Sequence, residues 1–85
     1  MNKASSILKE TRLDKDFTVE EVSKKTKIPI KYLLALESDD THAYPQEPYC
    51  SLYVKDYADY LTLNGQEILK LFRRDYYQKN HQNYQ

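Results

Sequence analysis

Residues 18–38 hold two short helical patterns that are separated by only three residues. The first pattern opens with a capping box, in which the hydroxyl of Thr18 and the carboxylate of Glu21 can each satisfy a free backbone N–H group. The second opens at Pro29, whose missing N–H group costs nothing in the first turn of a helix. Two helices joined by the turn 26–28 have the spacing of a helix-turn-helix.

The remainder of the chain also favours helix. One glycine and three prolines among 85 residues argue against an all-β fold, because closely spaced β-turns normally use those residues. A chain of this length fits one domain. The apolar periods and turn signals predict helices over about 5–14, 18–25, 29–37, 49–62 and 66–77. We therefore expect an all-α, five-helix domain over residues 1–77 and a disordered tail over 78–85, which could be the start of a linker.

Local signals refine these helices. Ser5 or Ser6 is expected to cap the first helix. Asp16 lies in the break after it, and aspartate tolerates the left-handed conformation that such a break often needs. Phe17 and Val22 have the spacing of a hydrophobic staple across the next helix start.

The composition excludes several classes of protein. No stretch approaches the roughly 18 consecutive apolar residues of a membrane-spanning helix, and the first 25 residues lack a secretory signal. Cys50 is the only cysteine, which excludes an internal disulfide and fits a reducing compartment. We therefore expect the domain to be cytoplasmic.

A specific family resemblance follows from a series of segments. They are Leu8-Lys9-Glu10-Thr11-Arg12, Phe17-Thr18-Val19-Glu20-Glu21-Val22, Thr26-Lys27-Ile28, Tyr32-Leu33-Leu34-Ala35-Leu36-Glu37, Pro45, Tyr49 and Tyr57-Ala58-Asp59-Tyr60-Leu61. In this order they resemble the N-terminal cytoplasmic domain of the RodZ family of bacterial cell-shape proteins, a branch of the phage-repressor-like helix-turn-helix fold. The resemblance covers about residues 5–72.

The resemblance implies a partner. Members of that family carry the domain on the cytoplasmic side of a single membrane span, here outside residues 1–85, and bind the actin-like filament protein MreB. Two positions depart from the family pattern, because Lys15-Asp16 and Leu52 stand where glycines are usual. The second departure bears on how closely a partner can approach.

The helix over 49–62 carries four of the nine tyrosines. At about 100° per residue, its core face comprises Cys50, Val54, Tyr57, Ala58 and Leu61. Tyr49, Tyr53 and Tyr60 form a second stripe, of which Tyr60 is expected to pack inside the domain. Tyr49 and Tyr53 are expected to be exposed, and they match the filament-contacting positions that the resemblance implies. Exposed tyrosines are frequent in protein interfaces.

The alternative function is a DNA-binding transcriptional regulator that uses the helix over 29–37. A helical wheel places Tyr32, Leu33 and Leu36 inward and Lys31, Leu34, Ala35 and Ser38 outward. The outward set contains no Arg, Asn or Gln, the residues that read base edges together with Lys. Lys27 and Lys31 are the candidate DNA contacts, but we regard DNA as the less favoured partner.

The formal net charge of zero hides a basic–acidic–basic order. Residues 1–31 carry eight Lys/Arg against five Asp/Glu, residues 32–69 one against seven, and residues 70–85 four against one. The acidic middle segment surrounds the tyrosines and would steer a basic partner toward them. The last four cations of the chain are expected either to face a membrane surface or to complement the dipole of their own helix. They are Lys70, Arg73, Arg74 and Lys79.

No pattern in the sequence indicates an enzyme, a cofactor or a metal. His42 and His81 are isolated, and Cys50 is expected to be an inert core thiol. The carboxylates are expected to be surface residues. We expect the isolated domain to be a monomer.

Overall fold

The computed structural model describes residues 3–81, which form five α-helices and one short 3₁₀ helix. The helices are α1 (Ala4–Asp14), α2 (Val19–Thr26), α3 (Ile30–Ser38), α4 (Tyr49–Tyr60) and α5 (Gly65–His81), and the 3₁₀ turn η1 (Thr41–Ala43) lies between α3 and α4. The predicted all-α, five-helix fold is confirmed. α4 ends at Tyr60 rather than Thr62, and α5 continues to His81 instead of ending at Tyr77. Residues 82–85 of the predicted tail lie outside the described residues.

The capping box at the start of α2 is present as predicted. The Glu21 N–H group donates to Thr18 Oγ1 over 3.1 Å, and the Thr18 N–H group donates to Glu21 Oε1 over 2.9 Å. Asp16 adopts the predicted left-handed conformation, with φ 59°. The predicted cap of α1 is wrong, because neither serine caps it and Ser5 is buried inside the helix. The Ala4 N–H group instead donates to Asp75 Oδ2 over 2.8 Å, so α5 supplies the missing acceptor.

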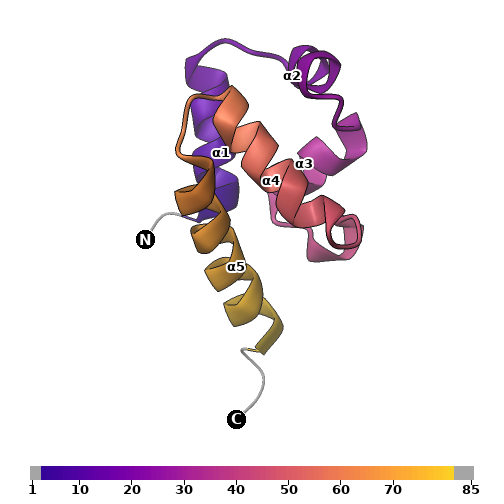
Figure 1. The fold of residues 1–85 in the computed structure, drawn as a ribbon, viewed down its shortest axis with the longest axis vertical. Coiled ribbons are helices and arrows are strands. Elements are labelled where there is room, and N and C mark those ends of the chain that lie inside the picture. Colours follow the sequence, from indigo (N-terminus) through magenta and orange to yellow (C-terminus); the bar gives the residue numbers. More distant parts are fainter. Residues whose placement is uncertain (1–2, 82–85) are drawn as a thin grey trace.

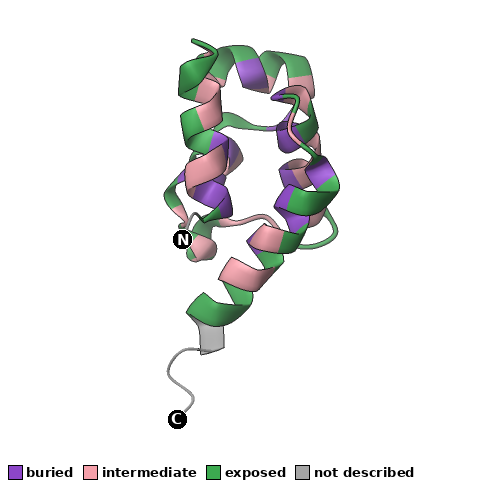
Figure 2. Cartoon of the chain, turned by 90° about the vertical axis from the view of Figure 1, so that its left-hand side faces the viewer, coloured by how far each residue is buried: buried purple, intermediate pink, exposed green. Residues whose placement is uncertain are grey.

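The helices surround one core, with α4 lying against α5 and α2 and α3 forming the helix-turn-helix (Figure 1). Buried residues line the inner faces of the helices, whereas the last turns of α5 project beyond the body of the domain (Figure 2). The largest fully buried side chains are Tyr57, Leu8, Ile28, Leu33, Leu36, Leu61, Val22 and Val54.

α4 and α5 bury the faces that their periods predict. On α4 and its C-cap these residues are Cys50, Val54, Tyr57, Ala58 and Leu61, and on α5 they are Ile68, Leu69 and Phe72. Tyr60 packs inside the domain as expected, with its ring centroid 5.5 Å from that of Phe17. α4 is therefore anchored by a complete apolar face, and Tyr49 and Leu52 remain exposed outside it.

A buried polar cluster joins three helices beneath this apolar face. Arg12 of α1 donates to Glu37 of α3 from Nε to Oε2 over 2.7 Å, and the Tyr57 hydroxyl of α4 donates to the same carboxylate. Glu37 is only 8% exposed, so the expectation that the carboxylates are surface residues is wrong for this residue. The position is tolerated because Arg12 supplies the opposite charge and Tyr57 a further hydrogen bond.

The prediction for the outward face of α3 is wrong at one residue. Ala35 is buried, whereas Lys31, Leu34 and Ser38 are exposed as predicted. The chain turns back over the end of α3, where the Asp40 N–H group donates to the Ala35 carbonyl over 3.1 Å.

Candidate functional site

The first two turns of α4 present an aromatic pair at the surface. Tyr49 is 56% exposed, and the ring centroid of Tyr53 lies 6.2 Å away from that of Tyr49. Tyr53 is half-buried, so the predicted exposure holds in full for Tyr49 alone. The core face on the other side of α4 fixes the direction in which both rings point.

The aromatic surface extends from α4 onto α3. The Tyr32 ring lies 5.9 Å from the Tyr53 ring, centroid to centroid, and the Lys31 ammonium lies 5.0 Å from the centroid of Tyr32. We call Tyr32, Tyr53 and Tyr49 the aromatic ladder. A shallow groove of about 340 Å³ runs beside it and is lined by Tyr32, Pro45, Gln46, Tyr49 and Tyr53. A cation close to an aromatic face is stabilised there, so Lys31 belongs to the same surface as the tyrosines.

Two further α4 residues share the exposed stripe of Tyr49 and Tyr53. Leu52 is 48% exposed, and Asp56 is partly exposed one turn further along the helix. Residues three and four apart are neighbours on a helix surface, so this stripe is continuous. We call Tyr49, Leu52, Tyr53 and Asp56 the α4 face. The bulky Leu52 enlarges the apolar part of this face rather than disturbing the core.

The outward side of α3 is largely apolar for a helix that would read DNA. Ile30 is 38% exposed and Leu34 49% exposed, and Lys31 lies between them in sequence. Lys27, the other candidate DNA contact, is exposed at the end of α2 in a left-handed conformation with φ 67°. This side therefore offers phosphate-binding cations but few groups that could specify a base.

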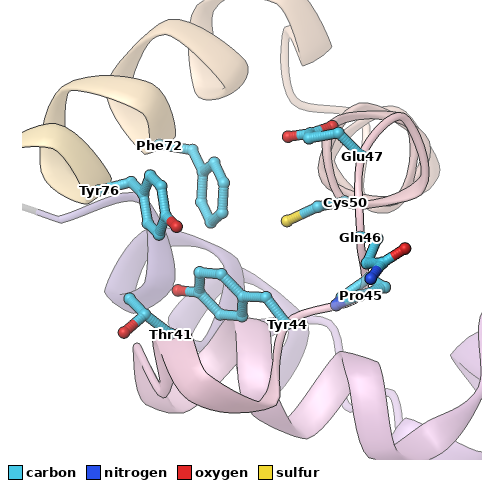
Figure 3. A pocket seen from close by; sticks show the side chains of 8 residues that line it. All are labelled: Thr41, Tyr44, Pro45, Gln46, Glu47, Cys50, Phe72 and Tyr76. Atoms are coloured by element: carbon cyan, nitrogen blue, oxygen red, sulfur yellow. The ribbon is translucent and has the colours of Figure 1, made fainter. Parts of the chain in front are cut away.

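A second cavity of about 270 Å³ lies between the start of α4 and α5 (Figure 3). Its lining residues are Thr41, Tyr44, Pro45, Gln46, Glu47, Cys50, Phe72 and Tyr76. Burial and the nearby Glu47 charge raise the pKa of Cys50 to about 12, and burial also raises the pKa of Tyr44. The thiol is therefore protonated at neutral pH and is a poor nucleophile. Pro45 and Gln46 separate this cavity from the groove of the aromatic ladder, because they line both.

The arrangement agrees with a comparison of the chain with known families. Residues 7–68 match the helix-turn-helix domain family. The chain belongs to that family. No curated protein and no solved structure matches it.

Membership of the helix-turn-helix domain family fits a binding role, since such domains are typically non-catalytic. Among residues 3–79, whose side chains the structure describes, no three His, Cys, Asp or Glu side chains gather as a metal site would require. Among the helices that the structure describes, none is both long enough and apolar enough to cross a bilayer. His42 is exposed on η1, and the side chain of His81 lies outside the described residues.

Sequence reasoning missed two contributors to the site of this helix-turn-helix domain. The helical period of α3 places Tyr32 only on the inward side, yet its ring joins the α4 tyrosines. The sequence offers Lys31 only as a DNA contact, although it lies over that ring. The Tyr32–Tyr53 contact depends on the distance between α3 and α4, which no periodicity within one helix reveals, and this contact is what brings Lys31 to the α4 tyrosines.

Proposed function

We propose that this helix-turn-helix domain is a protein-interaction module and that its partner is the actin-like filament protein MreB, bound through the α4 face. The resemblance to the RodZ family supplies the identity of the partner. The observation that carries the proposal is the exposed Tyr49, beside Leu52 and Tyr53, on a helix whose opposite face already fills the core.

The residue types on this face suit protein recognition. Tyrosine offers a large, rigid contact area and a hydroxyl that can form a hydrogen bond, and it is enriched among residues that dominate binding energy. The groove beside the aromatic ladder can accept an apolar side chain of the partner. Acidic residues predominate between residues 32 and 69, which favours the approach of a basic partner surface.

We further propose that the domain works at the cytoplasmic face of the inner membrane, held there by a span outside residues 1–85. The support is again the RodZ resemblance. Lys70 and Arg73 are exposed on α5, the helix that leads away from the body of the domain. Basic residues near a span are typical of its cytoplasmic side.

DNA binding is the second candidate function, since many helix-turn-helix domains bind DNA. Lys24, Lys25, Lys27 and Lys31 are exposed along the helix-turn-helix and could contact phosphates. The exposed Ile30 and Leu34 place apolar groups where base-reading side chains would be needed. This composition favours the protein partner.

Co-sedimentation with polymerised MreB tests the proposal. The wild-type domain should pellet with the filaments, and Tyr49→Ala/Tyr53→Ala should bind at least about 30-fold more weakly, as loss of about 2 kcal/mol at an interface hot spot implies. Tyr77→Ala is the matched control, because Tyr77 is 62% exposed on α5 and does not line the groove beside the aromatic ladder. Circular dichroism melts should confirm that every variant folds. Failure of the wild type to pellet, or equal pelleting of the double variant, would refute the proposal.

A further inference from the structure

Two side chains of opposite charge adjoin the aromatic ladder. Lys31 lies over the Tyr32 end, and Asp56 lies one helical turn beyond Tyr53 on α4. Among residues 3–79, no oppositely charged side chain lies within 4 Å of either the Lys31 ammonium or the Asp56 carboxylate. The neighbouring acid on α4, Asp59, differs in this respect, since Lys55 pairs with it over 3.2 Å.

We propose that the docking surface is not confined to α4 but includes Tyr32 and Lys31 of α3, and that the partner presents a carboxylate to Lys31 and an Arg or Lys to Asp56. This inference rests on the proposed function and adds the charge pattern of the partner. It also reassigns Lys31 from a phosphate contact to a protein contact.

The physical argument concerns what happens when the tyrosines are covered. A partner that covers the ladder from Tyr32 to Tyr53 also removes water from Lys31, which lies over the Tyr32 ring, and from Asp56, which follows Tyr53 on α4. A charge that is desolvated without a counter-charge is strongly unfavourable. A partner with the opposite charge order avoids this penalty, whereas one with the same order is repelled at both edges. The two edges therefore select the partner and fix its orientation on the ladder.

The Lys31–Tyr32 contact gives the basic edge a defined position. The ring and the ammonium are 5.0 Å apart, within the range in which a cation is attracted to an aromatic face. The Tyr32 ring is in turn packed on Tyr53. Lys31 is thus held against the same ladder that the partner contacts, unlike Lys24 and Lys25, which are exposed on α2 without such a ring contact among the described residues.

Charge-reversal variants test this proposal through their affinity for polymerised MreB. Lys31→Glu and Asp56→Lys should each weaken binding to polymerised MreB by about tenfold or more, the effect of losing one close charge pair and gaining repulsion. Lys24→Glu and Glu10→Lys are the matched controls, because both positions are exposed and neither contacts the ladder. These controls should stay within about twofold of the wild type.

The double variant Lys31→Glu/Asp56→Lys tests whether a change in net charge alone explains the weaker binding of the single variants. Its net charge equals that of the wild type, yet its charge pattern is inverted, so its binding should be weaker than that of either single variant. Lys24→Glu/Glu10→Lys also keeps the net charge and should bind like the wild type. Thermal melts of all six variants should lie close to the wild-type curve.

The outcomes separate this inference from the proposed function. Absence of wild-type binding would refute both. Loss of binding in Tyr49→Ala/Tyr53→Ala, together with normal binding of Lys31→Glu and Asp56→Lys, would refute the charge pattern and leave the α4 face as the site. Normal filament binding of Lys31→Glu, with weaker binding of a random 20-base-pair duplex, would return Lys31 to the DNA-contacting role.

Discussion

The guanidinium of Arg12 and the carboxylate of Glu37 form a two-pronged pair inside the domain, with Nε 2.7 Å from Oε2 and one terminal nitrogen 3.1 Å from Oε1. The Tyr57 hydroxyl donates to the same carboxylate, and the other terminal nitrogen of Arg12 donates to the Phe17 carbonyl over 2.7 Å. The hydrogen bond to Glu37 raises the pKa of Arg12, while burial, followed by the hydrogen bond to Glu37, raises that of Tyr57. The pair thus joins α1, α3, α4 and the loop before α2.

Arg12→Met should destabilise the domain by about 3–5 kcal/mol, because it leaves the Glu37 carboxylate buried without a cation. That loss is a large part of the roughly 5–15 kcal/mol by which such domains are stable. The double variant Arg12→Met/Glu37→Met should recover most of the stability, since it removes both charges. Urea unfolding followed by circular dichroism measures the differences.

A surface pair provides the control for this experiment. Lys55 and Asp59 are 39% and 48% exposed in their side chains, and Lys55→Met should cost less than about 1 kcal/mol. An Arg12→Met variant as stable as Lys55→Met would contradict the importance of the buried pair.

Stability should decrease in alkaline solution from about pH 9 upward. The pKa of Cys50 is raised to about 12 in the folded domain, above the value near 8.5 of an unfolded thiol. The unfolded chain therefore loses this proton first, so the stabilisation that is present below pH 8.5 is lost as the pH rises. Tyr44 and Tyr57, whose pKa values burial also raises, add to the decrease above about pH 10.

Melting temperatures measured from pH 7 to 10 test this linkage. Cys50→Ala should show a smaller decrease between pH 8.5 and 10 than the wild type, whatever its stability at pH 7. Parallel curves for the two proteins would argue against the raised thiol pKa.

Thr62→Asn should raise the stability by about 0.5–1 kcal/mol. Thr62 has a left-handed backbone with φ 62°, a conformation that a β-branched residue adopts at a cost and asparagine adopts readily. The side chain is exposed, so the change disturbs no core contact. For a domain of this size the melting temperature should rise by a few degrees. A lower melting temperature would show that the Thr62 hydroxyl contributes more than the strain costs.

Binding to random duplex DNA should be weak and should vanish between low and moderate salt. The exposed Lys27 and Lys31 can contact phosphates, and such contacts release counterions, which makes the affinity depend steeply on salt. Fluorescence anisotropy at two salt concentrations measures this. A tight complex with one particular sequence at physiological salt would instead favour the transcriptional regulator.

The isolated domain should bind anionic vesicles weakly and neutral vesicles not at all. Lys70 and Arg73 are exposed at adjacent positions on one side of α5, and each cation near an anionic surface contributes about 1 kcal/mol. Lys70→Gln/Arg73→Gln should abolish the binding in a flotation assay. Lys79→Gln should have less effect, because Lys79 already pairs with Asp39 over 3.6 Å. Equal absence of binding to both vesicle types would refute a membrane role for Lys70 and Arg73, which also lie too far from the end of α5 at His81 to complement its dipole.

Much of this structure could be predicted because it depends on neighbours in sequence. The capping box of Thr18, the left-handed Asp16 and the apolar face of α4 follow from spacing within single segments. The buried Glu37 could not be predicted, since a charge is accepted in the interior only when a distant partner meets it. The same holds for Tyr32, whose place in the aromatic ladder depends on how closely α3 approaches α4.

α5 is 17 residues long, about 25 Å, and its outer turns are fastened to the ends of two other helices. Asp75 accepts from the first residue of α1, and Lys79 reaches Asp39 at the end of α3. A pulling force applied along α5 would therefore load these contacts with α1 and α3 as well as the turn that joins α5 to α4. The domain would meet such a force at three places along the helix rather than at its first residue alone.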